Sequence, residues 1–135
     1  MVEPILKWAG GKRQLLSEIT ALFPISYEAY HEPFVGGGAV FFHQDPNDGT
    51  INDLNTRLTT FYEIVRDQPD ALIAENKTHE HTEEYYYDAR SEFNTLLTQS
   101  TLARDERVRE ASLLLYLNRT CFNGLYRENS DGEFN

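Results

Sequence analysis

The sequence is poor in the residues that build disulfides, metal centres and membrane spans. Its 135 residues include a single cysteine, Cys121, which excludes an intramolecular disulfide and a multi-cysteine zinc site. The four histidines include no helical metalloprotease pair. The longest apolar run, residues 113–117, is far shorter than the roughly 20 residues that a transmembrane helix needs. We therefore expect no metal site and no membrane contact.

Signals for export and for disorder are missing as well. The first residues lack a basic stretch followed by an apolar one, so the sequence predicts no secretory signal and a cytoplasmic location. Hydrophobic residues at 40% and aromatic residues at 13% are too abundant for an intrinsically disordered chain. No repeat, low-complexity tract or Gly/Ser linker marks an internal domain boundary.

Basic residues are scarce, and the excess of acid is unevenly distributed. The formal net charge is −10, which by itself argues against a nucleic-acid surface. Residues 45–110 carry 15 acidic and 7 basic side chains, however, whereas residues 1–44 and residues 111–135 each have a net charge of −1. The nine arginines outnumber the three lysines, and this bias together with the acid resembles a salt-adapted proteome, in which high ionic strength screens repulsion.

Hydrophobic spacing predicts that helices and strands alternate in the first half of the chain. Apolar residues recur at helical spacing over 12–23, until Pro24 ends the pattern. A strand within 29–34 runs into three glycines and a helix that begins at Ala39. A second strand is expected at 50–52, after an Asn-Asp-Gly turn. This order is typical of a parallel α/β sheet.

Helices dominate the prediction for the second half. The helix after the second strand would bury one side, formed by Leu54, Leu58, Phe61, Tyr62 and Val65. Three further helices fit residues 69–76, 83–98 and 104–119. The tail from Thr120 to Asn135 is rich in turn residues, and we expect it not to be helical.

A glycine turn and an acidic residue are placed where open α/β sheets bind cofactors. Gly36, Gly37 and Gly38 follow the first predicted strand, so the backbone can approach a ligand closely at the carboxyl end of that strand. Asp53 follows the second strand, where such folds place an acid that accepts hydrogen bonds from ribose hydroxyls. The spacing lacks the G-x-G-x-x-G pattern, which disfavours a nicotinamide cofactor. A plain tight turn and a helix N-cap are the structural alternatives for the glycines and for Asp53.

Near the N-terminus, Lys7, Trp8 and Lys12 surround a Gly-Gly turn. The start of the predicted helix and Lys12 suit an anionic group such as a carboxylate, and Trp8 offers a flat stacking face. Arg13 stands where a phosphate loop needs a hydroxyl, which disfavours an ATPase.

The C-terminal segment combines amides, guanidinium groups and aromatic rings over residues 117–135. Amide and guanidinium side chains read base edges, and aromatic rings can wedge between base steps. The same composition also suits a polar surface loop. By contrast, the tyrosines at 85–87 are more typical of helix packing than of a base-stacking platform.

Four motifs, taken in order, resemble those of the Dam-type DNA adenine-N6 methyltransferases. They are Lys-Trp-Ala-Gly-Gly-Lys at 7–12, Glu-Pro-Phe-Val-Gly-Gly-Gly at 32–38, Asn-Asp-Leu-Asn at 52–55 and Asn-Arg-x-x-Phe-Asn-Gly-Leu-Tyr-Arg-x-Asn-x-x-Gly-x-Phe-Asn at 118–135. The resemblance implies an α/β fold with a partial Rossmann-like domain that binds S-adenosylmethionine, in residues 1–66, and a helical module that recognises duplex DNA, in residues 67–135. It also implies methyl transfer to adenine N6, with GATC as the first guess for the site.

The resemblance assigns roles to individual residues. Positions that match the cofactor-binding segments are Trp8, Lys12, Glu32, Pro33, Phe34, Gly36, Gly38 and Asp53. Positions that match the DNA-reading segments are Lys7 and, on an expected hairpin, Phe122, Asn123 and Arg127. Phe122 would wedge into the duplex, and Arg127 would contact a base edge or a phosphate.

The catalytic Asp-Pro-Pro-Tyr motif of the family is absent from these 135 residues. Asp45-Pro46-Asn47 does not replace it, since Asn47 stands at the second proline and the aromatic residue is missing. We therefore assign no catalytic residue and expect an N-terminal fragment that is inactive without a complementing C-terminal chain. Two other interpretations stay open: a non-catalytic DNA- or cofactor-binding remnant of a split or decayed gene, and a nucleotide-binding module of another enzyme.

Overall fold

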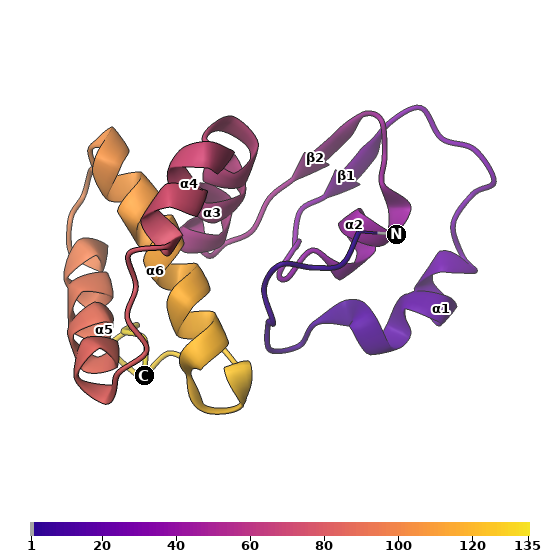
Figure 1. The fold of residues 1–135 in the computed structure, drawn as a ribbon. Helices are drawn as coiled ribbons and strands as arrows, with labels where there is room; N and C mark the ends of the chain where they lie inside the picture. Colours follow the sequence, from indigo (N-terminus) through magenta and orange to yellow (C-terminus); the bar gives the residue numbers. More distant parts are fainter. Residues whose placement is uncertain (1) are drawn as a thin grey trace. The chain divides into compact units, whose positions relative to one another are not determined.

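The chain folds as two compact units, which the computed structural model describes over residues 2–135 (Figure 1). The first unit ends at Thr56, and the second runs from Arg57 to Asn135. The division falls at the start of a helix and not in a Gly/Ser linker, which is why composition alone does not mark it.

The first unit contains a short two-stranded parallel sheet. Strand β1 covers Tyr30–Glu32 and strand β2 covers Gly49–Ile51, with Tyr30 opposite Gly49 and Glu32 opposite Ile51. Helix α2, Ala39–Gln44, connects the two strands. The strand, glycine turn, helix and second strand predicted from the sequence are confirmed, and so is the parallel α/β arrangement.

Residues with left-handed backbone conformations fix both ends of α2. Gly38 has φ 77° and ψ 18°, a conformation that glycine adopts at little steric cost, and its carbonyl accepts a hydrogen bond from the Phe42 amide at 2.9 Å. Asp45, with φ 45°, ends the helix and donates its N–H to the Phe41 carbonyl. Pro46 follows directly and cannot continue the helix.

The helix expected over 12–23 is shorter and less regular than its spacing predicts. It begins as a 3₁₀ turn, Lys12–Leu15, and continues as helix α1 only over Leu16–Thr20. The amides of Leu22 and Phe23 bond to carbonyls three residues back, which tightens and ends the last turn. Leu22 is largely exposed, so the described residues do not cover that side of the helix.

The second unit consists of helices followed by an irregular tail (Figure 1). Its helices are α3 at Thr56–Asp67, α4 at Pro69–Asn76, α5 at Glu83–Leu97 and α6 at Arg104–Thr120. The last three predicted helices are confirmed, and α4 has the predicted bounds. Within residues 2–135 no helix is both long and apolar enough to cross a membrane.

Helix α6 is the most buried helix of this unit and packs against both α4 and α5 (Figure 1). Leu113, Leu114 and Leu117 are completely buried, as is Phe93 of α5. Removing apolar area of this size from water is the main favourable term in folding. The core of the second unit therefore lies along α6.

The buried side of α3 differs in part from the predicted one. Leu58 and Phe61 are buried as expected, but Leu54 is largely exposed and Ile64 is buried in addition. The reason is the start of the helix at Thr56, which leaves Leu54 in the preceding loop. Ile64, three residues after Phe61, then lies on the same side of the helix.

The tail is largely irregular, as predicted, but its hairpin is in a different place. Phe122 and Asn123 belong to a short 3₁₀ turn, Phe122–Gly124, in which Asn123 has φ 58°. The only bridge in the described tail pairs Glu128 with Phe134 in antiparallel fashion. The side chain of Asn129 closes that turn, because its Oδ1 accepts hydrogen bonds from two backbone amides that follow. The expectation of a hairpin that bears Phe122 and Asn123 is therefore wrong.

A half-buried histidine connects the loop after α4 to α5 and α6. His79 Nδ1 lies 2.8 Å from the Tyr85 hydroxyl, and Nε2 lies 2.8 Å from the Ser112 hydroxyl. The imidazole also stacks on the Tyr116 ring with centroids 4.6 Å apart. Burial lowers the pKa of His79 from its ordinary value near 6.5, and the positive charge of Arg109 lowers it further.

We expect this histidine to make the second unit less stable in mild acid. The unfolded chain binds a proton at His79 near pH 6.5 and the folded chain binds it only at lower pH, so stability is present above pH 6.5 and is lost as the pH falls. Glu75 and Glu92 face the same region through Arg109, and the lowered pKa of Glu92 adds a loss in the same direction in stronger acid.

The measurement is the melting temperature between pH 7.5 and pH 5.5 for the parent and for His79→Gln. The variant should depend less on pH than the parent, whereas His81→Gln, which changes an exposed histidine of the same loop, should behave like the parent. Equal pH dependence in all three proteins would contradict the role of His79.

The excess acid predicts that salt stabilises the fold. At 1 M salt the Debye length falls to about 3 Å, which screens repulsion among the acidic side chains of residues 45–110. The melting temperature should therefore rise as potassium chloride is increased from dilute buffer to 1 M. A melting temperature indifferent to potassium chloride would count against salt adaptation.

Candidate functional site

The first unit places the glycine turn and Asp53 beside each other. Because β1 and β2 are parallel, the residues after each strand meet at the same edge of the sheet. The Val35 amide donates to the Asn52 carbonyl at 2.9 Å, and the Gly36 amide donates to Asp53 Oδ2 at 2.9 Å. The glycine turn and Asp53, each predicted to follow a strand, thus lie beside each other in the fold.

The Asp53 carboxylate also caps the segment that leads into α3. Its Oδ1 accepts a hydrogen bond from the Asn55 amide at 3.0 Å. Asp53 therefore caps the local backbone and also lies in the candidate site. Each carboxylate oxygen can accept more than one hydrogen bond, so a half-buried Asp53 retains capacity for a hydroxyl group of a ligand.

An ion pair between a buried carboxylate and a half-buried lysine fixes the strand that precedes the glycine turn. Glu32 is only 6% exposed, and its Oε1 accepts from Lys12 Nζ at 2.7 Å. Its Oε2 accepts from the Tyr30 hydroxyl at 2.8 Å. Burial and the Glu32 carboxylate raise the pKa of Tyr30, so that hydroxyl stays protonated and keeps donating. With both oxygens bonded, Glu32 meets the requirement that a buried charge be paired.

Lys12 therefore contacts an anionic group of the protein itself. Besides Glu32, its ammonium donates to the Phe34 carbonyl at 2.5 Å, which holds the start of the glycine turn. An ammonium has three donors, so one remains beyond these two bonds. The field of a helix N-terminus adds little here, because the 3₁₀ turn and α1 are both very short.

Trp8 lies against the glycine turn, and this close packing explains the need for glycine. A Cβ added at Gly37 would lie 3.1 Å from the Leu6 carbonyl oxygen and 3.2 Å from Trp8 Cβ. A Cβ at Gly36 would lie 3.5 Å from Trp8 Cδ1, and that position has φ 53°. The N-terminal segment and the glycine turn are therefore in direct contact.

The fold thus brings together most of the predicted cofactor residues. The residues that contact one another around the sheet edge are Trp8, Lys12, Glu32, Phe34, Gly36 and Asp53. Gly38 starts α2, while Pro33 and Lys7 are exposed in the same unit. Sequence reasoning missed Tyr30, although the two-residue repeat of a strand places Tyr30 and Glu32 on one face.

The predicted DNA-reading residues of the second unit lie together on its tail. Phe122 is 72% exposed, and Asn123 and Arg127 are exposed as well. The guanidinium carbon of Arg127 lies 5.8 Å from the centroid of the Phe122 ring, within the range of a cation–π contact. An exposed aromatic ring and an arginine are therefore held side by side.

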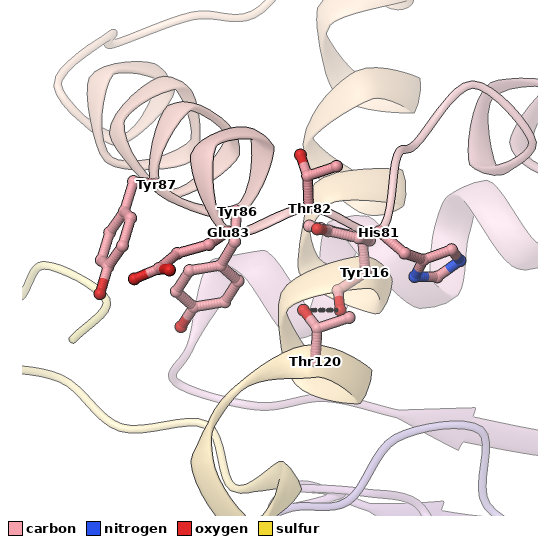
Figure 2. A pocket seen from close by; sticks show the side chains of 7 residues that line it. All are labelled: His81, Thr82, Glu83, Tyr86, Tyr87, Tyr116 and Thr120. Carbon is pink, nitrogen blue, oxygen red and sulfur yellow. Dashed lines mark hydrogen bonds between the residues drawn. The ribbon is translucent and has the colours of Figure 1, made fainter.

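The second unit also has a pocket of about 300 Å³ between the start of α5 and the end of α6 (Figure 2). It is lined by His81, Thr82, Glu83, Tyr86, Tyr87, Tyr116 and Thr120. The Thr120 hydroxyl donates to the Tyr116 carbonyl at 2.8 Å, shown as a dashed line in Figure 2, and the Tyr116 hydroxyl donates to the Glu80 carbonyl. The expected packing role is confirmed for Tyr85 and Tyr86, which are half-buried, whereas Tyr87 is exposed.

No group of three His, Cys, Asp or Glu side chains among residues 2–135 is placed to hold a metal ion. The groups that could bind a ligand in the candidate sites of residues 2–135 are carboxylates, an ammonium group, backbone amides and aromatic rings. These groups suit a polar organic ligand in the first unit and a polyanion or its bases on the tail of the second.

Comparison with known proteins identifies the same family that the four sequence motifs resemble. Residues 8–135 match the family model described as "D12 class N6 adenine-specific DNA methyltransferase". The chain is 41% identical over 136 residues to the "Type II methyltransferase M1.LlaDCHI" of Lactococcus lactis subsp. cremoris, covering 99% of this chain and 46% of that protein. It is 39% identical over 137 residues to the "DNA adenine methylase" of Haemophilus influenzae, covering 98% and 45%.

A third relative, the "Type II methyltransferase M.MjaIII" of Methanocaldococcus jannaschii, is 38% identical over 152 residues, covering 99% of this chain and 51% of that protein. The chain thus spans about half the length of the curated relatives it matches. Since the family model covers nearly all of it, the chain belongs to the D12 class of N6 adenine-specific DNA methyltransferases.

Proposed function

We propose that the chain is the part of a site-specific DNA methyltransferase that binds S-adenosylmethionine and reads DNA. The complete reaction is methyl transfer to adenine N6 in duplex DNA, at a GATC-like site, in the cytoplasm. The observation that carries this proposal is the bond between the Gly36 amide and Asp53, which joins the glycine turn to an acid at one sheet edge in a chain of this family. Cofactor binding is assigned to residues 1–66 and DNA recognition to residues 67–135.

The donor set at the sheet edge fits this cofactor. Asp53 has the acceptor capacity that ribose hydroxyls need, and Trp8 presents a flat ring beside the glycine turn. Lys12 and Glu32 bring one charge of each sign close to Phe34, as a zwitterionic amino-acid group requires. The bound cofactor supplies a methyl group on a positively charged sulfur. Pro33, Gly36 and Gly38 shape the backbone around that group.

The tail of the second unit fits a role in reading DNA. Phe122 is exposed enough to wedge between base steps, and Arg127 can present its fork of donors to a base edge or to a phosphate. Asn123, between them in sequence, offers an amide for adenine. Lys7 adds a cation in the first unit. The excess of acid, which would repel the phosphates, lies in residues 45–110 and outside this tail.

Binding without turnover is the second candidate function. These 135 residues contain the four matched motifs but no Asp-Pro-Pro-Tyr motif, so taken by themselves they would bind without catalysing transfer. In the family, that motif supplies the carboxylate that accepts from the adenine amino group and the ring that stacks on the flipped base. If a complementing C-terminal chain restores methyl transfer, the chain is a catalytic part; if it does not, the chain is a non-catalytic remnant.

The cofactor site can be tested with Asp53→Ala. Loss of hydrogen bonds to a charged acceptor should weaken S-adenosylmethionine binding by about 1.5 to 3 kcal/mol, measured by calorimetry. Asp48→Ala, which removes an exposed acid just before β2, serves as the matched control and should bind like the parent. A melting curve confirms that each variant is folded. Unchanged affinity in folded Asp53→Ala would remove Asp53 from the site.

The activity can be tested by tritium transfer from labelled S-adenosylmethionine to duplex DNA. The adenine amino group is a poor nucleophile until groups aimed at it hold and polarise it, so the chain alone should transfer no label. Co-expression with a C-terminal piece from a relative, bearing Asp-Pro-Pro-Tyr, should restore labelling of adenine. The same piece with its Asp changed to Ala should not. Turnover by the purified chain alone would overturn the assignment of Asp53 and Asn123 to binding.

A further inference from the structure

The tail of the second unit has two buried aromatic rings, separated by a run of exposed side chains. Tyr126 is 5% exposed and Phe134 is 2% exposed, whereas Arg127 and Phe122 point into solvent. The Tyr126 and Phe134 rings lie 5.3 Å apart, and Phe134 meets Phe93 of α5 edge to face at 6.1 Å. Two buried rings therefore hold a segment whose exposed side chains are the proposed DNA readers.

A buried arginine at the start of α3 holds the first of these rings. Arg57 is 3% exposed, and its Nη1 donates to the Tyr126 hydroxyl. That hydroxyl in turn donates to Glu128 Oε1 at 2.7 Å. The guanidinium carbon also lies 4.1 Å from the Phe93 ring centroid, over its face.

The position of Arg57 is set by charge as well as by packing. A guanidinium stays charged in proteins, so its burial must be balanced by partners. Glu110 of α6 is buried nearby and interacts with Arg57 electrostatically, while burial raises the pKa of its carboxyl. Moving Arg57 away would remove one of the two arginines, Arg57 and Arg107, whose charges act on the buried Glu110 carboxyl, and this opposes a shift of the guanidinium.

An asparagine on α5 holds the other end of the segment. Asn94 Nδ2 donates to the Phe134 carbonyl at 3.0 Å, and Asn94 Oδ1 accepts from the Phe134 amide at 2.8 Å. The side-chain amide thus satisfies both backbone groups of one residue, as a neighbouring strand would. The next amide, that of Asn135, donates to the Arg127 carbonyl at 3.1 Å. Asn94 is therefore linked through two residues to the backbone of Arg127.

We propose that Arg57 and Asn94 are positioning residues for sequence recognition, which hold the segment from Tyr126 to Asn135 so that Arg127 meets a base edge in register. The inference rests on the proposed DNA-reading function of this segment. Bidentate recognition of a base depends on accurate placement of the donor fork, and supporting contacts of this kind supply it. The affinity for any duplex, whatever its sequence, depends mainly on the charge of the protein surface. Arg57 and Asn94 do not contribute to that surface charge, so they should affect sequence recognition and not overall affinity.

Two substitutions separate positioning from folding. Tyr126→Phe removes the hydroxyl that accepts from Arg57 but keeps the buried ring, and Asn94→Ala removes the bonds to Phe134. Tyr116→Phe is the matched control, because Tyr116 is also 5% exposed and loses a hydroxyl bonded to the Glu80 carbonyl, in the same unit. The parent first selects its preferred duplex from a randomised pool, with a GATC duplex included, and the selected sequence is then scrambled for comparison.

Fluorescence anisotropy with the selected and scrambled duplexes gives the ratio of the two affinities. We expect this ratio to fall about fivefold or more in Tyr126→Phe and in Asn94→Ala, with affinity for the scrambled duplex retained. It should stay at the parent value in Tyr116→Phe. Hydrogen exchange provides a DNA-independent readout: the Asn129 and Asn135 amides should exchange faster in the first two variants only.

The possible outcomes separate two kinds of failure. If the parent selects no sequence, the DNA-reading function fails and the inference falls with it. If the parent selects a sequence and the ratio survives both substitutions, only the positioning role is overturned. An equal fall of the ratio in Tyr116→Phe would show a general effect of stability and would also overturn it.

Discussion

The pairing of two short parallel strands determines what the first unit can do. Each strand contributes only three residues, so the sheet depends on the contacts that continue beyond its ends. The Val35 amide extends the ladder to Asn52, and the Gly36 amide then turns onto the Asp53 carboxylate. That last bond joins the glycine turn to the acid that follows β2. The proposed roles of the glycine turn and of Asp53 in cofactor binding depend on these two loops staying in register.

Each unit contains a buried charged side chain that helps to fix its candidate site, although the two arrangements differ. In the first unit, the Glu32 carboxylate is paired with Lys12 and accepts a hydrogen bond from Tyr30 at the end of β1. In the second, Arg57 lies among aromatic rings and shares the Tyr126 hydroxyl with Glu128. Both cost desolvation energy and both are paired, so removing one partner should be more damaging than removing the pair. Such networks restrict side chains to one geometry, which a binding surface requires.

Local signals in the sequence predicted the elements well. Pro69 at the first turn gives α4 its predicted start, and Thr82 caps α5 through a hydrogen bond from the Tyr85 amide. The glycine turn and Asp53 were also predictable, because chain order in a parallel sheet brings strand ends together. The motifs identified the family from the same positions.

Interactions between distant residues could not be read from the sequence. Lys12 and Glu32 are 20 residues apart, and Arg57 and Tyr126 are 69 apart, so no periodicity connects them. The hairpin was misplaced for a related reason: the turn is closed by the Asn129 side chain, whereas the composition at 122–124 equally suits a turn. The bonds that close this turn are local, but Asn94 of α5 holds Phe134 after the turn, and no local signal predicts that contact.

The central claim is that one chain carries a cofactor site in its first unit and a DNA-reading surface on the tail of its second. Mapping of ¹H–¹⁵N chemical shifts on the 135-residue chain tests this most directly. S-adenosylmethionine should shift the amides of Gly36 and Asn55, whereas a short duplex should shift those of Phe122, Asn123 and Arg127. Cofactor-induced shifts confined to the helices of the second unit, or no shifts at Gly36 and Asn55 at saturating cofactor, would contradict the account.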